Sequence, residues 1–204
     1  MTIRRSTPSR PLTSTAAAAC LLLIIVGCSR APAPAEKPAP STGTRQLGVA
    51  VSCPTQPEWK LVKSDERETR FERASAVDPT VASSRTLAGT TFGGGDDLLA
   101  RLEAWKQSQL ATTPGLKQDS LHFDRVKFKG LTCLRYDGSF EDVSEPRSEF
   151  SRFNFKGYLC PLGDTERSVV EIEVSNRSTQ KGFSDEMIRS ADEFFEAAVF
   201  TPAK

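Results

Sequence analysis

The sequence predicts an α+β fold in which two main helices pack on a mostly antiparallel sheet. Three observations predict it. Several extended runs follow one another with only short turns between them, which favours antiparallel pairing of neighbouring strands. Helical patterns occur in only two places, one in mid-chain and one near the C-terminus. Residues 46–204 are long enough to bury a single hydrophobic core that needs no disulfide or metal to be stable.

The N-terminal part of the chain is predicted to lie outside this fold. All aromatic residues lie between Trp59 and Phe200, so the first 45 residues have little to contribute to a core. We therefore divide the chain into residues 1–27, which have the layout of an export signal, residues 28–45, which are rich in Pro and Ala, and one globular domain over residues 46–204.

In the first half of the domain, extended runs precede a helix. The third run alternates charged residues around Phe71, as expected of a half-exposed strand. Asp96 and Asp97 then open a helix, because acidic side chains favour the N-terminal end of the helix dipole. The expected apolar face of this helix is Leu98, Leu99, Leu102 and Trp105. The expected extended runs are 47–51, 59–62, 68–73 and 85–92.

In the second half, four more extended runs precede the second helix. Lys129 and Gly130 form the predicted turn between the first two of them. Ser184 is a suitable N-cap, followed by an acidic first turn. The expected runs are 120–128, 131–140, 150–159 and 167–174. The apolar face of the second helix is predicted to be Met187, Ile188, Ala191, Phe194, Phe195 and Ala198.

This order of elements resembles the α/β/α sandwich of the PsbP-like superfamily, which includes DcrB-type lipoproteins. The resemblance covers roughly residues 47–200 and depends on the early strand before Trp59, the mid-chain helix, the strand that leads into Ser175-Asn176-Arg177, and the last helix that ends in Phe200. It implies a binding or assembly role without catalysis. It transfers no functional residue.

The end of the export signal is more specific. Basic residues at the start are followed by an uncharged apolar run over residues 16–26, which is too short to span a bilayer. Ile25-Val26-Gly27-Cys28 then resembles the lipobox of bacterial lipoproteins. The resemblance implies diacylglyceryl transfer to the Cys28 sulfur, cleavage before Cys28 and N-acylation of the new amine, for example with palmitate. The alternative is an ordinary signal peptide with an incidental cysteine.

Residues 28–45 are expected to form a lipidated cysteine and a tether. Prolines mixed with Ala, Ser and Thr make a semi-rigid spacer that holds the domain away from the membrane. Several acyl chains on one residue anchor a protein firmly without spanning the bilayer. Ser29 follows Cys28, and the absence of Asp there suggests delivery to the outer membrane, with the domain in the periplasm. The inner membrane and the cell surface remain as alternatives.

Charge and composition exclude some classes of function. The whole chain carries a formal charge of +1, and residues 46–204 hold 25 acidic against 21 basic side chains. A general nucleic-acid binder is therefore not expected, and neither is a domain that lies flat on an anionic membrane. One His and five Cys leave little material for a metal site, and no cofactor motif is present.

The cysteines predict one disulfide. Export to an oxidising compartment favours a bridge among Cys53, Cys133 and Cys160. If Cys133 faces Cys160 in an antiparallel pair, Leu134 faces Leu159 and the apolar residues of both strands share one face. We therefore favour Cys133–Cys160 over a bridge with Cys53. Cys53 is then a buried apolar residue or a redox thiol.

Other candidate sites have simpler explanations. His122 is the only His and lies in an alternating strand, which favours a surface or packing role. Gly93–Gly95 lack the Lys of a phosphate loop, so a flexible connection is expected. Glu171 and Glu173 alternate with apolar residues and are expected on the wet face of a strand.

The sequence thus predicts a non-enzymatic, membrane-anchored envelope module. It would be attached through Cys28 and would bind an envelope protein partner, without cofactor, metal or nucleic acid. The alternative is a tethered periplasmic enzyme, a hydrolase or thiol-redox protein, that uses His122 or Cys53. A third reading is a passive component bound to peptidoglycan.

Overall fold

The computed structural model describes residues 48–55, 58–74, 79–92, 96–143, 151–163 and 168–201. The predicted export signal, Cys28 and the tether lie outside the described residues, as do Gly93–Gly95. The division of the chain into signal, tether and domain therefore stays a prediction.

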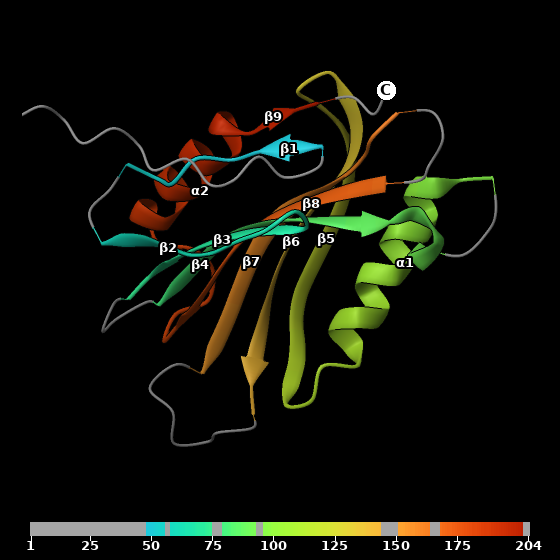
Figure 1. The fold of residues 1–204 in the computed structure, drawn as a ribbon. Coiled ribbons are helices and arrows are strands. Elements are labelled where there is room, and N and C mark those ends of the chain that lie inside the picture. Colours follow the sequence, from blue (N-terminus) through green and yellow to red (C-terminus); the bar gives the residue numbers. More distant parts are fainter. Residues whose placement is uncertain are drawn as a thin grey trace, which may run out of the picture. The chain divides into compact units, whose positions relative to one another are not determined.

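A seven-stranded antiparallel sheet forms the centre of the domain (Figure 1). Its strand order is β2-β3-β4-β8-β7-β6-β5, and every neighbouring pair runs antiparallel. A separate two-stranded pair joins β1 to β9. The strands are β1 (Val49–Ala50), β2 (Trp59–Ser64), β3 (Glu68–Arg73), β4 (Thr80–Ala88), β5 (Leu116–Phe128), β6 (Leu131–Asp142), β7 (Arg152–Pro161), β8 (Ser168–Ser178) and β9 (Val199–Phe200).

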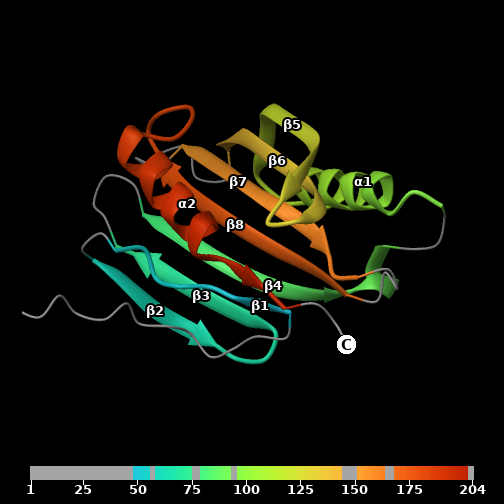
Figure 2. The same cartoon turned by 90° about the horizontal axis from the view of Figure 1, so that it is seen from above.

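The two α-helices lie against opposite faces of this sheet (Figures 1 and 2). Helix α1 (Leu98–Ala111) lies toward the β5 end of the strand order, whereas α2 (Asp185–Ala197) lies over the middle strands, from β3 to β7. Helix α1 is capped by Asp97, whose carboxylate accepts a hydrogen bond from the backbone N–H of Ala100 at 3.2 Å. Helix α2 is capped by Ser184, whose hydroxyl accepts from the N–H of Met187 at 3.3 Å. Ser184 is the cap that the sequence predicts, whereas Asp97, expected in an acidic first turn, lies just before the helix as its N-cap.

The alternation of β8 divides the apolar core into two layers. Val170, Ile172 and Val174 point toward α2 and pack with the apolar side chains of β2, β3 and β4. Val169 points the other way, into the layer beneath α1. Because side chains alternate along a strand, one strand supplies both layers. The α2 layer includes Phe71 on Phe194, with ring centroids 6.2 Å apart.

The predicted α+β class is confirmed, and the observed elements depart from the predicted ones mainly at their ends. Strand β4 begins at Thr80 rather than at residue 85, because its whole length pairs with β3 or β8. The run expected to continue to Phe92 instead ends in a short 3₁₀ helix, η1 (Gly89–Phe92). The turn at Lys129 and Gly130 is present, and both residues have positive φ, as a type I′ hairpin turn requires.

Gly157 on β7 is required by close packing against the two neighbouring strands, β6 and β8. A Cβ atom there would lie 2.4 Å from the backbone oxygen of Ile172 and 2.6 Å from the hydroxyl of Tyr136. We expect Gly157→Ala to lower the free energy of unfolding by about 1–3 kcal/mol, because a backbone atom cannot yield as a side chain does. Urea unfolding at neutral pH measures this. Gly130→Ala is a poor control because of its positive φ, whereas Ala104→Ser on the exposed side of α1 should change little.

Candidate functional site

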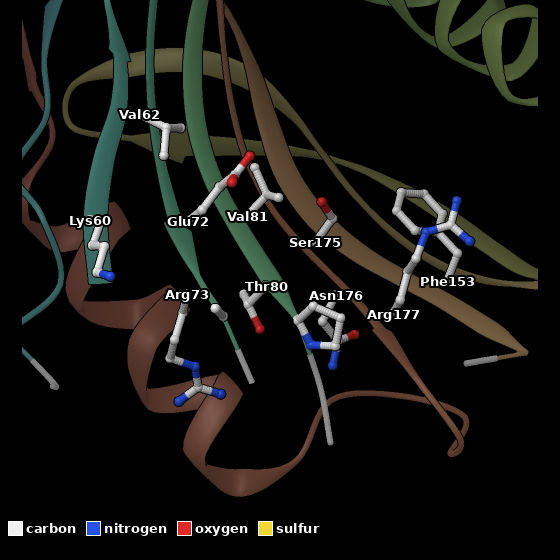
Figure 3. A pocket seen from close by; sticks show the side chains of 12 residues that line it. Lys60, Val62, Glu72, Arg73, Thr80, Val81, Phe153, Ser175, Asn176 and Arg177 are labelled. Atoms are coloured by element: carbon white, nitrogen blue, oxygen red, sulfur yellow. The ribbon is translucent and has the colours of Figure 1, made fainter. Parts of the chain in front are cut away.

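Each helix covers only part of its face of the sheet, and the uncovered part beside each is hollowed. On the α1 side, a pocket of about 410 Å³ lies over β2, β3, β4 and the adjoining ends of β7 and β8 (Figure 3). We call it the open-face pocket. On the α2 side, a groove of about 500 Å³ lies between α2 and the strands β6 and β7, and we call it the α2 groove.

The strand register builds the open-face pocket. Lys60 pairs with Glu72, Glu72 with Val81, and Val81 with Ser175, so these four residues form one row across β2, β3, β4 and β8. The β2–β3 register shifts between Leu61 and Lys63. Figure 3 shows the side chain of Val62, at this irregularity, on the same side of the sheet as Glu72 and Val81.

The floor of the open-face pocket is largely apolar. Val62 is 50% exposed, and Val81 and Phe153 are half-buried. The guanidinium of Arg177 lies 5.8 Å from the ring centroid of Phe153, a cation–π arrangement, and it also pairs with the carboxylate of Asp142. An exposed apolar surface of this kind is typical of a binding site rather than of an ordinary sheet face.

The charged side chains that line the open-face pocket differ in whether they have an ion-pair partner. Glu72 is engaged by Arg70 at 2.5 Å, although Arg70 is not itself a lining residue. The buried Arg73 pairs with Glu186 of α2. Lys60 is exposed and has no acidic partner within 4.0 Å among the residues that the structure describes.

A second feature of the α1 face is a buried ionic cluster beneath the helix. The ammonium of Lys106 donates to Glu171 and to Glu173, each at 2.7 Å. The hydroxyl of Tyr136 bonds the same two carboxylates, at 2.8 and 2.9 Å. Arg85 pairs with Glu171 from the exposed side. Lys106 is 3% exposed, Glu171 2% and Tyr136 fully buried.

The pKa values of the cluster follow from burial and from these charges. Burial by itself would raise the pKa of Glu171, but the charges of Lys106 and Arg85 outweigh it and hold that pKa at about 2. Burial would lower the pKa of Lys106, but the carboxylates of Glu173 and Glu171 raise it above its ordinary value. Burial, with Glu171 and Glu173 nearby, raises the pKa of the Tyr136 hydroxyl well above its usual range.

This cluster is a structural one. Lys106 and Glu171 stay charged at neutral pH, and each has its hydrogen bonds made within the protein, so neither is poised to exchange a proton with a substrate. The prediction that Glu171 and Glu173 lie on a wet face was wrong: α1 covers them and supplies their counterion. Lys106 could not be recognised from the sequence as part of a buried cluster, since a lysine between Trp105 and Gln107 gives no sign of burial.

The α2 groove has an apolar side and a charged side. Ile188, 40% exposed, lies on it with Phe183 and Phe195, although the sequence placed Ile188 on the buried face of the helix. Ser190 occupies that buried face instead. Lys156 of β7 pairs with Asp192 of α2 at 3.0 Å across the groove. Arg135 and Asp137 of β6 complete a mixed charged border.

The cysteines and His122 occupy separate places. Cys133 and Cys160 form a disulfide beneath the α2 side of the sheet, with Cα atoms 4.4 Å apart. The predicted register around it is present, since Leu134 pairs with Leu159 and Phe140 with Phe153. Cys53 is buried in the α2-side core, whereas His122 is exposed on β5. Cys28 lies outside the described residues.

The fold and its hollows define an α+β domain whose antiparallel sheet carries one helix and one open surface on each face. Similarity to a solved structure was found for LpqN, described as involved in cell envelope biogenesis of Mycobacterium tuberculosis: it covers 80% of this chain and 90% of that chain, with a TM-score of 0.48 and 15% sequence identity. No protein-family model matches the sequence, and no curated protein matches it.

The described residues contain neither a membrane-spanning helix nor a cluster of metal ligands. None of the helices in that part of the chain is long and apolar enough to cross a bilayer. In the same part, no three side chains of His, Cys, Asp or Glu gather in the way that metal ligands do.

Proposed function

We propose that the chain is a lipid-anchored protein of the bacterial envelope whose domain binds an envelope protein partner and catalyses no reaction. The observation that carries the proposal is the open surface on each face of the sheet, hollowed into the open-face pocket and the α2 groove. Such surfaces, with apolar centres and charged borders, are typical of contact sites.

The site chemistry supports binding over catalysis. An activated nucleophile needs a base within hydrogen-bond reach. Neither hollow is lined by His or Cys, since His122 lies on β5 and Cys53 lies between β1 and β2. The charged groups beneath α1 form their hydrogen bonds with one another. The proposal therefore assigns no catalytic role to His122 or to Cys53.

The anchor supports an envelope location. The lipobox pattern at Ile25-Val26-Gly27-Cys28 and the Pro-rich segment after it provide an acylated cysteine and a spacer. With Ser29 after the cysteine, we assign the anchor to the outer membrane and the domain to the periplasm. An anchored domain searches for its partner within the reach of its tether, which raises the effective concentration of both.

Site-specific photo-crosslinking in living cells tests the proposal. A photoreactive residue is placed at Val62 in the open-face pocket or at Ile188 in the α2 groove, in the full chain with Cys28 intact. We expect at least one of these positions to capture a defined envelope protein. We expect the yield to fall at least tenfold, a change of about 1.4 kcal/mol in effective affinity, when Cys28→Ala releases the anchor.

Val143 provides the matched control, because it is 50% exposed, as Val62 is, and lines neither hollow. If Val143 captured the same protein with equal yield, the contact would not be specific to either hollow. The absence of any captured protein from both Val62 and Ile188 would contradict the proposed function. Radiolabelled palmitate incorporation into the wild type, and its loss in Cys28→Ala, checks the acylation separately.

A further inference from the structure

We propose that the open-face pocket binds a small free organic acid, a molecule with one anionic group on a compact apolar body. The inference rests on the proposed function in one respect only, namely that the domain works by binding. The open-face pocket would bind the small acid, and the α2 groove would bind the protein partner.

The floor of the pocket favours an apolar body over a peptide. The backbone groups beneath it are used in the ladders between β3, β4 and β8. Polar side chains at its border are also engaged: Thr80 donates to the Met187 sulfur at 3.0 Å, and Asn176 accepts from Asn154 at 3.2 Å. A bound peptide would lose its hydrogen bonds to water and find few replacements, which costs free energy for each unpaired group.

An apolar body has no hydrogen bonds to water that it would lose on binding. Val62, Val81 and Phe153 offer it a surface that is now in contact with water, and covering that surface is favourable. A volume of about 410 Å³ lies within the range of small-ligand sites, which is about 300–1,000 Å³.

The charges favour an anion. Lys60, Arg73 and Arg177 line the pocket against a single acid, Glu72, whereas acidic residues are in excess over residues 46–204 as a whole. Arg73 and Arg177 already hold the carboxylates of Glu186 and Asp142. Lys60 is the lining cation with no such partner in the described part of the chain, and Glu72, directly across from it, is turned to Arg70. One carboxylate or sulfonate beside Lys60 would complete the pairing.

The same charges distinguish a free acid from the headgroup of a membrane lipid. A domain with 25 acidic and 21 basic residues is repelled by an anionic bilayer. The Lys60 ammonium is one local positive charge and not a basic patch, so it suits a single anion that diffuses into the pocket.

Titration with anilinonaphthalene sulfonate, an aromatic monoanion, tests the inference by calorimetry. The protein is the full chain with Cys28→Ala, so that its own acyl chains do not bind the dye. We expect saturable binding to one site, weaker by about tenfold in Lys60→Gln and lost in Val62→Asp. Both side chains are exposed, so neither change should alter the melting temperature. Phenylnaphthylamine, which is the same body without the anion, should bind at least tenfold more weakly than the sulfonate.

Two matched variants locate the site. Lys117→Gln makes the same change on an exposed lysine of the far edge strand, and Val143→Asp makes it on a valine of equal exposure outside the pocket. Both should bind the dye as the parent does. Any of three results would overturn the inference: the protein binds the neutral dye as tightly as the sulfonate, Lys60→Gln binds the sulfonate as tightly as the parent, or the protein binds to anionic phosphatidylglycerol vesicles. If Ile188 still captures a partner in cells, the proposed function survives that failure.

Discussion

Replacing Lys106 by Met is expected to lower the free energy of unfolding by about 3–5 kcal/mol, the usual cost of removing one partner from a buried ion pair. Methionine keeps most of the volume of the lysine stem, so little of the loss comes from a cavity. The loss arises because Glu171, 2% exposed, and Glu173 keep their charges without the ammonium that bonds both at 2.7 Å. Urea unfolding at pH 7 measures it.

The matched control is Lys117→Met, the same substitution at a lysine whose side chain is 73% exposed, where the change should stay within about 0.5 kcal/mol. Adding Glu171→Gln to Lys106→Met should recover part of the loss, because the variant then buries one charge fewer. A Lys106→Met protein as stable as the wild type would show that α1 is held by its leucines alone.

The pH dependence separates charge from packing in the same variant. The pKa of Glu171 is about 2 in the folded protein against 4.5 for an ordinary glutamate, so its contribution to stability is present above pH 4.5 and is lost as the pH falls toward 2. Without Lys106 the pKa of Glu171 is no longer lowered as far. The difference in stability between wild type and Lys106→Met should therefore narrow as the pH falls below 4.5, whereas a packing defect would keep it constant.

Local patterns in the sequence predicted the parts of the fold that local physics controls. Asp97 and Ser184 cap their helices because a side-chain oxygen satisfies an unpaired N–H at the first turn. The β6–β7 register followed from setting Cys133 opposite Cys160, because that pairing also brings Leu134 opposite Leu159 on one apolar face, and a slip by one residue would turn both to the wrong face. The structure contains both the register and the disulfide.

The sites depend on contacts that these patterns do not contain. The open-face pocket exists because β2 and β3 lie at one end of the sheet and α1 at the other, and strand order is decided by the whole chain. Glu171 and Glu173 alternate with apolar residues along β8, which suggested a solvent-exposed face. Helix α1 instead covers this face, and its Lys106 forms ion pairs with both glutamates. A buried charge and its partner are recognised only as a pair, and here the two lie 65 residues apart.

Removing the Cys133–Cys160 disulfide is expected to lower the free energy of unfolding by about 3–4 kcal/mol, which is the chain-entropy value for a bridge that spans 27 residues. Cys133→Ala/Cys160→Ala makes the change without leaving a buried thiol. Both positions are fully buried against the α2 side of the sheet, so small cavities add to the entropic loss. Chemical unfolding of the oxidised parent and the double variant, at equal pH and without reductant, gives the difference.

Cys53→Ala is the control, because it removes a buried sulfur without touching a cross-link, and it should cost about 1 kcal/mol. Reductant should lower the stability of the parent by most of this difference and leave the double variant unchanged. The bridge joins the ends of β6 and β7, whose residues Tyr136, Phe155 and Leu159 form the layer beneath α1. Reduction should therefore loosen β6 and β7 first, and the amides of these two strands should exchange hydrogen faster than those of β3 and β4. Equal exchange in both pairs would mean that the bridge stabilises the domain only as a whole, through its unfolded state.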